Sequence, residues 1–427
     1  MTSRQGAATV TVTPEVAVPP GKRWVILAGG VLVQLALGGV YAWSTFAKAM
    51  TNPDGFGWSQ AEAAVPFETA FGMIFVGAFI GGRIQDARGP RTVAMAGGLI
   101  YSLGVIIASF ANTKDSLLLL VVGYGVIGGF GLGMAYIVPI AMLQKWFPDR
   151  PGLITGIVVG GFGFGAVITS PIGHVLIEAN KAVPTKSFLY LGIAYLIAIL
   201  IGASAFANPP AGYRPAGMPA PVKNAIGSDD DYTVGEALRT PQWYLLTGIL
   251  TLIIFSGISL ISVAAASASD IAGFSKGGAA SLVSVLGLMN GSGRIFWAWI
   301  SDKIGKMPAF ASLLAIEGVC LLLLPHASST ALFAMLAALI ILCMGGGLGA
   351  MPSTAGRFFG VSRAGGIYGL MLIAWSIAGV VGPLVVHALI GTNKNYAAGF
   401  TTVGIIALAA IVLTFITKPP HHDARKH

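Results

Sequence analysis

The sequence predicts an all-α membrane protein with twelve transmembrane helices in two pseudo-symmetric six-helix bundles. Of its 427 residues, 55% are hydrophobic and only 10% are charged, whereas a soluble chain carries about 25% charged residues. Apolar runs close to the roughly 20 residues that cross a bilayer recur along the whole chain. Twelve such runs are centred near residues 37, 72, 101, 130, 165, 197, 254, 288, 316, 342, 377 and 406.

A long polar interruption divides the twelve runs into six and six. It extends from residue 209 to residue 240 and contains the acidic run Asp229–Asp231, which we expect to lie in solvent. The interruption predicts a linker between two bundles, with a polar tail at each end of the chain. The predicted tail, bundle, linker, bundle and tail cover residues 1–22, 23–208, 209–240, 241–418 and 419–427.

The net charge of +9 does not indicate a nucleic-acid partner, because of where the basic residues lie. An even number of spans puts both termini on one side, and 18 of the 25 Lys and Arg residues fall on that side of the predicted topology. Cytoplasmic loops carry the excess of Lys and Arg in membrane proteins. We therefore expect a monomer in the lipid bilayer of the cell inner membrane, with both termini in the cytoplasm.

Two short loops at equivalent places in the two halves share a pattern, in which an Asp precedes a Gly and a basic residue. Such a carboxylate can pair with basic residues or cap the N-terminus of a neighbouring helix. We expect these loops to act as gates that hold the halves together on the cytoplasmic side; a tight turn with topogenic charge is the alternative. The repeat indicates related bundles with a substrate site between them. The residues are Asp86, Arg88, Gly89, Arg91, Asp302, Gly305 and Lys306.

Arg294 lies inside the apolar run 277–300, and no acidic residue occurs between Lys276 and Asp302. A cation at that depth costs on the order of several kcal/mol unless it faces a wet cavity or a partner. Asp302 lies about 12 Å of helical rise further on, and side chains tilt toward the helix N-terminus, so Arg294 is poorly placed to reach the cytoplasmic headgroups. Its fork of N–H donors suits a carboxylate. We predict that Arg294 binds an anionic substrate.

Further polar side chains near the middle of the membrane extend this predicted site. Asn290 precedes Arg294 by about one helical turn on the same face, and Tyr136 lies about 15 Å from the end of its span. Tyr41 in the first span is a third candidate. The alternatives are a bond from Asn290 to a neighbouring helix and an interfacial belt for the tyrosines, which we expect for Tyr368.

Several titratable residues lie within or at the ends of the spans and could carry a proton. We rank Glu68 first, because its span flanks the cleft of paired-bundle transporters, and His387 second. Glu317 lies in a span that is usually peripheral, and Asp270 closes the seventh span. A local hydrogen bond without a transport role is the alternative for each.

No Walker-type motif, nucleophile–base pair or metal-ligand spacing stands out in the sequence. We expect no enzyme activity, no cofactor and no metal site. Cys320 and Cys343 both fall within spans, so no disulfide is expected. A substrate-sensing membrane receptor built on a transporter scaffold is the alternative from a different functional class.

Over residues 20–418 the chain resembles the major facilitator superfamily, and within it the oxalate/formate antiporter family and the related monocarboxylate transporters. The resemblance rests on residues 145–150 (KWFPDR), 238–243 (LRTPQW), 290–306 and 352–354 (PST). It implies the paired-bundle fold and a substrate site that includes Arg294, Tyr136 and Tyr41.

The chain departs from the oxalate carriers at the predicted site. The resemblance places Trp375 where those carriers have a second cation, a lysine, and it places Met344 and Leu348 where they have aromatic residues. A dianion that faces only Arg294 would keep one unpaired charge in a low-dielectric site, so a lactate- or pyruvate-type monocarboxylate is favoured and oxalate/formate exchange is the alternative. Proton symport is implied by the resemblance, but Asn290 cannot act as the aspartate that animal monocarboxylate transporters use there.

Overall fold

The computed structural model describes residues 18–19, 21–215, 231–391 and 393–420. Most of the two predicted tails and residues 216–230 of the predicted linker, with Asp229 and Asp230, lie outside these ranges. The regular elements within the described residues are all helical. The helices of the first half are α1 (Lys22–Leu37), α2 (Trp43–Thr51), α3 (Gln60–Arg88), α4 (Pro90–Ala108), α5 (Leu117–Leu120), α6 (Gly129–Trp146), α7 (Pro151–Glu178) and α8 (Ser187–Ser204).

The second half follows a short helix at the end of the linker, α9 (Val234–Leu238). Its helices are α10 (Pro241–Ala272), α11 (Lys276–Ile304), α12 (Lys306–Leu323), α13 (Thr330–Phe359), α14 (Ala364–Met371), α15 (Ile373–Ile390) and α16 (Tyr396–Ile416). A 3-10 turn, η1 (Gly38–Ala42), joins α1 to α2, and a π-helical segment, η3 (Val121–Gly128), leads into α6. Each irregular segment lies inside one predicted span. The helical path continues through it, so that Lys22–Thr51 and Lys114–Trp146 each form one long stretch.

Eleven helical stretches of the described residues are long and apolar enough to cross a membrane, which confirms a multi-pass helical membrane protein. The predicted span that is missing from the eleven is the one centred near residue 288. It forms α11, a helix of 29 residues that carries Asn290, Arg294 and several serines, and these polar residues lower its mean hydropathy. The number of twelve spans stays a prediction.

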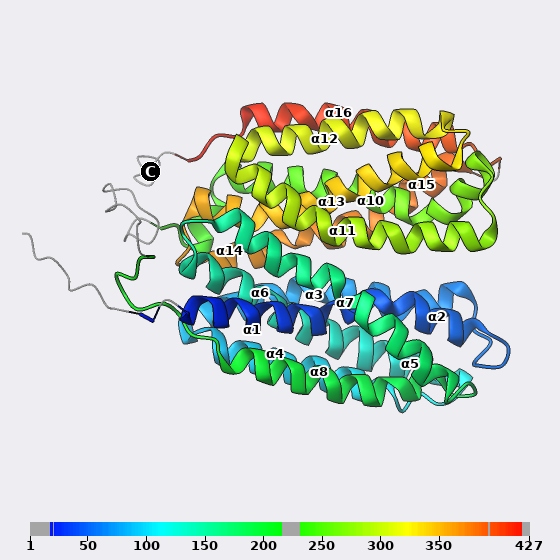
Figure 1. The fold of residues 1–427 in the computed structure, drawn as a ribbon, viewed down its shortest axis with the longest axis horizontal. Helices are drawn as coiled ribbons and strands as arrows, with labels where there is room; N and C mark the ends of the chain where they lie inside the picture. The colour runs from blue at the N-terminus through cyan, green and yellow to red at the C-terminus, as the bar shows by residue number, and fades with distance from the viewer. Residues whose placement is uncertain (1–17, 20, 216–230, 392, 421–427) are drawn as a thin grey trace, which may run out of the picture.

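The helices form two groups that lie side by side (Figure 1). Helices α1–α8 make one group, the N-half, and α10–α16 make the other, the C-half. The beginning of α1 at Lys22 and the end of α16 at Ile416 lie at the same end of the molecule, on the left of Figure 1. We call this end the terminal end and the opposite one the distal end.

The two halves meet backbone to backbone between the terminal end and the middle of the molecule. A Cβ atom placed on Gly156 of α7 would lie 2.6 Å from the carbonyl oxygen of Arg294, and one on Gly163 would lie 2.7 Å from the Cα of Gly291. Helices α3 and α14 are joined in the same way, with Gly82 against Gly365. Small residues allow such close approach of membrane helices, so glycine pairs form the closed part of the interface.

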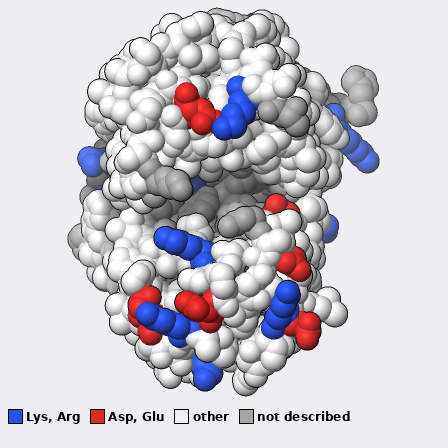
Figure 2. Space-filling view, turned by 90° about the vertical axis from the view of Figure 1, so that its right-hand side faces the viewer, with Lys and Arg blue, Asp and Glu red and all other residues white. Residues whose placement is uncertain are grey.

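Toward the distal end the halves separate. Gly287 of α11 and Gly379 of α15 lie one helical turn beyond residues of the central interface, and among the described residues no atom lies within 4 Å of a Cβ placed on either. The space-filling view of the distal end shows the surface hollowed between the two halves (Figure 2). The interface is therefore closed at the terminal end and opens distally.

Candidate functional site

Arg294 of α11 lies in the middle of the interface and is fully buried, with 0% of its surface exposed. Its Nε donates a hydrogen bond to the Asn290 Oδ1 at 3.0 Å. Its Nη1 donates to the Val159 carbonyl of α7 at 3.2 Å, and its Nη2 donates to the Tyr41 hydroxyl of η1 at 3.1 Å. A side chain of the C-half is thus held by two groups of the N-half.

Aromatic rings surround the guanidinium of Arg294. Its Cζ lies 5.9 Å from the ring centroid of Tyr41, 5.6 Å from that of Phe162 and 5.8 Å from that of Trp375. The Phe162 and Trp375 rings pack edge to face, with 6.0 Å between centroids. Each cation–π contact stabilises a cation by about 0.5–2 kcal/mol. We call Arg294 and the residues around it the central site, which consists of Tyr41, Tyr136, Phe162, Asn290, Arg294 and Trp375.

Tyr136 of α6 completes the ring cluster, with its ring centroid 5.0 Å from Phe162 and 6.2 Å from Trp375. The side chain is fully buried, and its O–H has no acceptor among the described residues. The hydroxyl lies close enough to Arg294 for the two to interact electrostatically. Buried tyrosine hydroxyls usually have a partner, so this one is free to donate to a molecule bound at Arg294.

Two buried glutamines support the backbone of α6 beside Tyr136. Gln34 Nε2 donates to the Tyr136 carbonyl at 3.0 Å, and Gln85 Nε2 donates to the Val138 carbonyl at 3.1 Å. Pro139 directly follows Val138 and has no backbone N–H to donate within the helix. Side chains from α1 and α3 therefore contact the stretch of α6 that contains this proline. Neither role was predicted from the sequence, although the amide of Gln34 inside an apolar run was a usable signal.

No carboxylate forms an ion pair with Arg294 among the described residues, whose four ion pairs all lie elsewhere. A buried cation without a counter-ion is costly. Of the five N–H donors of a guanidinium, three are engaged by Asn290, Val159 and Tyr41. Two donors remain, and they can bind the two oxygens of one carboxylate.

Met344 and Leu348, the predicted apolar lining, lie on α13 and are buried. A Cβ on Gly257 would lie 2.6 Å from the Met344 Cγ, which places Met344 against α10. The residues of α13 that touch the back of the central site are glycines: a Cβ on Gly349 would lie 2.7 Å from the Arg294 Cα. A binding role for Met344 and Leu348 stays a prediction.

Several aromatic residues of this region do not belong to the site predicted from the sequence. Phe162 packs on Arg294, and Phe71 packs edge to face on Trp375 with 5.3 Å between centroids. Tyr368 was expected in an interfacial belt, and this expectation is wrong, because Tyr368 is 1% exposed and interacts electrostatically with Tyr136 and Arg294. An apolar ring in a membrane span has no chemical signature in the sequence, so its position at a site becomes visible only in the structure.

The predicted proton carriers Glu68 and His387 are both exposed side chains. Glu68 is an exposed residue of α3. His387 is an exposed residue of α15, and its Nδ1 lies 2.7 Å from the Pro383 carbonyl. The described residues show no hydrogen bond or ion pair between either side chain and Arg294. A role for them in proton coupling stays a prediction.

The two predicted loops make equivalent contacts across the interface at the terminal end. Asp86 Oδ2, at the end of α3, accepts a hydrogen bond from the backbone N–H of Gly366 in the first turn of α14, at 2.9 Å. Asp302 Oδ2, near the end of α11, accepts one from the backbone N–H of Leu153 in the first turn of α7, at 3.0 Å. Each carboxylate therefore caps a helix of the opposite half.

Basic residues and glycines shape these loops within each half. Lys306 Nζ donates to Asp302 Oδ1 at 2.8 Å and to the Ser353 Oγ at 2.8 Å, beside a cavity of about 270 Å³. Arg91 Nε donates to the Phe206 carbonyl at 3.3 Å. Gly89 and Gly305 have φ angles of 88° and 97°, a region that favours glycine. Arg88 is exposed on the last turn of α3. A gating role for the loops stays a prediction.

The end of the linker is also fastened to the terminal end. Asp231 Oδ2 accepts a hydrogen bond from the Ser362 N–H at 2.8 Å, and the Tyr232 N–H donates to the Phe359 carbonyl at 2.9 Å. Lys145 Nζ, from the N-half, donates to the Ser362 carbonyl at 3.4 Å. Of the acidic run, Asp231 is half-buried and bound to the backbone of the α13–α14 turn.

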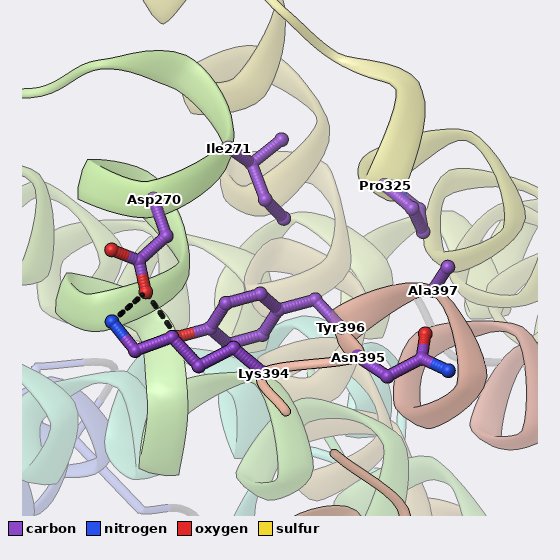
Figure 3. Close-up of a pocket in the computed structure, with 7 residues that line it drawn as sticks. All are labelled: Asp270, Ile271, Pro325, Lys394, Asn395, Tyr396 and Ala397. Atoms are coloured by element: carbon purple, nitrogen blue, oxygen red, sulfur yellow. Dashed lines mark hydrogen bonds and ion pairs between the residues drawn. The ribbon is translucent and has the colours of Figure 1, made fainter. Parts of the chain in front are cut away.

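A separate polar pocket of about 380 Å³ lies at the distal end of the C-half (Figure 3). Asp270 Oδ2 accepts hydrogen bonds from Lys394 Nζ at 2.9 Å and from the Tyr396 hydroxyl at 2.8 Å. These bonds tie the end of α10 to the connection between α15 and α16. Asp270 is therefore engaged in an ion pair away from the central site.

The amino-acid sequence matches a known protein family and several known transporters. A family model described as the Major Facilitator Superfamily matches residues 26–383 and 247–427. The chain is 29% identical to the oxalate:formate antiporter of Oxalobacter formigenes, over 93% of this chain and 92% of that one. It is 28% identical to the uncharacterized MFS-type transporter YhjX of Escherichia coli, over 84% and 86% of the two chains, and 24% identical to monocarboxylate transporter 12 of Rattus norvegicus, over 94% and 87%.

A solved structure shows the same fold at low sequence identity. The E. coli fucose:proton symporter superimposes with a TM-score of 0.70 at 13% identity, over 93% of this chain and 100% of that chain. The family model covers nearly all of the helical region described above. The chain therefore belongs to the major facilitator superfamily, whose members are membrane transporters and not enzymes.

Proposed function

We propose that this protein is a secondary active transporter that moves a small monocarboxylate of the lactate or pyruvate type across the cell inner membrane together with a proton. Transport would take place by alternating access around Arg294, between two bundles of six spans each. The observation that carries the proposal is the burial of Arg294 at the interface of the halves, with no carboxylate of the described residues beside it. Such a cation needs an anion, and a substrate carboxylate supplies one.

The chemistry of the central site supports one carboxylate rather than two. The guanidinium has two N–H donors that the described residues do not use, and the Tyr136 hydroxyl is a third free donor. The rings of Phe162 and Trp375 offer apolar surface for a short carbon chain. A dianion would keep one charge without a partner.

The shape of the interface supports alternating access. The caps made by Asp86 and Asp302 close the terminal end, while the distal end is open. With both termini in the cytoplasm, the central site would face the outside in this conformation. Exposure to the cytoplasm would require both caps to break while the distal parts of α3, α11 and α15 approach each other.

Exchange of oxalate for formate is the second candidate, and one observation favours it. The relative that carries out this exchange by name is 29% identical over 93% of this chain. Oxalate is a dianion, and the ring beside Arg294 is that of the uncharged Trp375. One charge of oxalate would have no cationic partner there, so we place this exchange second.

The test is uptake of labelled lactate, pyruvate, formate and oxalate into proteoliposomes, with and without a pH gradient. A proton symporter of monocarboxylates accumulates lactate or pyruvate when the outside is acidic. An exchanger takes up label only against an internal counter-substrate and ignores the pH gradient. Uptake of oxalate in preference to both monocarboxylates would contradict the proposal.

A further inference from the structure

Glu317 lies on α12, inside the C-half, and is fully buried with 0% of its surface exposed. Neither of its carboxyl oxygens has a hydrogen-bond partner among the described residues. An ionised carboxylate in such a place costs on the order of several kcal/mol more than the neutral acid, because neither a cation nor a donor compensates its charge. Glu317 therefore carries a proton in this conformation.

The surroundings of Glu317 contain thiols and no charged partner among the described residues. Cys320, about one turn along α12, and Cys343 of α13 are the titratable groups that interact with it. Helices α10, α11 and α16 also pack on α12, and no charged group from them acts on Glu317 in the described part of the chain. Its protonation thus depends on how well this part of the C-half excludes water.

The Glu317 region lies directly behind the central site. The Cys343 thiol lies within interaction distance of the Trp297 side chain of α11. Trp297 lies about one helical turn from Arg294 on the same helix. A Cβ on Gly345, two residues after Cys343, would lie 3.1 Å from the Asn290 Cα. Because α13 touches α11 through glycines, a shift of α11 at the central site would also move the neighbours of Glu317.

We propose that Glu317 binds the proton that is transported with the substrate, in place of the predicted carriers Glu68 and His387. This inference rests on the proposed function of proton-coupled carboxylate transport. In the described conformation Glu317 holds its proton. When α11 and α13 move during alternating access, water reaches the carboxyl group, its O–H bond breaks, a water oxygen takes the proton and the carboxylate keeps the electron pair.

The substitution Glu317→Gln tests this assignment, because glutamine has the size and neutrality of the protonated acid but cannot release a proton. We expect the variant to bind lactate or pyruvate and to exchange internal for external substrate as wild type does. We expect it to lose accumulation driven by an acidic exterior. Glu68→Gln is the matched control, and it should keep accumulation.

Other outcomes separate this inference from the proposed function. Accumulation by Glu317→Gln at the wild-type level, or its loss in Glu68→Gln alone, would overturn the assignment of Glu317 and leave carboxylate transport intact. A wild type that exchanges substrate but never accumulates it would contradict proton coupling and the inference together. Substrate binding that survives in Arg294→Ala would instead contradict the proposed function.

An independent measurement on the wild-type protein covers the case in which Glu317→Gln does not fold. Infrared difference spectra on substrate addition should contain the C=O band of a protonated carboxyl group, because substrate shifts α11 and changes the environment of Glu317. The absence of any such band would overturn the proposal.

Discussion

Asp86 and Asp302 make the same contact in opposite directions across the interface. Each accepts a hydrogen bond from a backbone N–H in the first turn of a helix of the other half, at 2.9 Å from Gly366 and 3.0 Å from Leu153. A hydrogen bond to a charged group contributes about 1.5–3 kcal/mol. Both bonds therefore stabilise the contact between the two halves at the terminal end.

Loss of one of these caps should shift the conformational equilibrium. In Asp302→Asn the amide is uncharged and a weaker partner for Leu153, so we expect a larger population that is open at the terminal end. Spin labels at Thr92→Cys and Lys418→Cys, two exposed positions of opposite halves at that end, should report longer distances. Asp54→Asn, an exposed site at the distal end, is the control; equal distances in all three proteins would contradict a gating role.

Removal of the guanidinium fork should abolish transport. Arg294→Ala leaves no cation for the substrate, and Arg294→Lys keeps the charge but loses the planar set of donors that reaches Asn290, Val159 and Tyr41. Both variants should insert and stay folded in detergent, as size-exclusion profiles will show. Arg214→Lys, at an exposed position, should transport normally. Uptake by Arg294→Ala near the wild-type rate would refute the central role of this residue.

The hydroxyl of Tyr136 should contribute to affinity but not to folding. Its neighbour is the Arg294 guanidinium, and its O–H has no acceptor among the described residues. Tyr136→Phe should therefore remove chiefly a bond to substrate, worth about 1–2 kcal/mol or roughly 5- to 30-fold in Kd. Calorimetric titration with the transported monocarboxylate measures this change. Tyr190→Phe, at an exposed tyrosine of α8, controls for loss of a hydroxyl. An unchanged Kd in Tyr136→Phe would make this tyrosine a packing residue.

A second cation at Trp375 should change substrate preference. The Trp375 ring lies 5.8 Å from the Arg294 Cζ, so in Trp375→Lys an ammonium group would face the same substrate as the guanidinium. We expect the affinity for oxalate to rise relative to that for lactate, together with a loss of stability from the close like charges. The ratio of the two Kd values at mildly acidic pH is the readout, with Trp375→Phe as the neutral control. A ratio that stays constant would show that shape, not charge, excludes dicarboxylates.

The sequence was sufficient for those features that depend on local composition. Apolar runs located the helices, and the lone cation in a span identified Arg294, whose bond to Asn290 follows from the spacing of one helical turn. Contacts between distant segments could not be predicted in this way. The bond from Arg294 to Tyr41 joins residues 253 positions apart, and the packing of Phe162 on Arg294 depends on how α7 meets α11.

Glu317 is a residue whose importance the sequence underestimated. The sequence placed it in a peripheral span and ranked it below Glu68, because helix position was the only information available. Whether a carboxyl group has partners depends on side chains from other helices. The structure shows that neither oxygen of Glu317 has a partner among the described residues, and this changes the ranking.

The glycines of α7 beside Arg294 make the centre of the interface sensitive to a single methyl group. A Cβ on Gly163 would lie 2.7 Å from the Gly291 Cα and 3.6 Å from the Arg294 Nε. Alanine at this position would act as a wedge that pushes the bundles apart at the level of the guanidinium. Conformational trapping of the carrier, for ligand soaking or for the selection of state-specific binders, could therefore start from one small substitution on the helix that supplies the Val159 carbonyl and the Phe162 ring to Arg294.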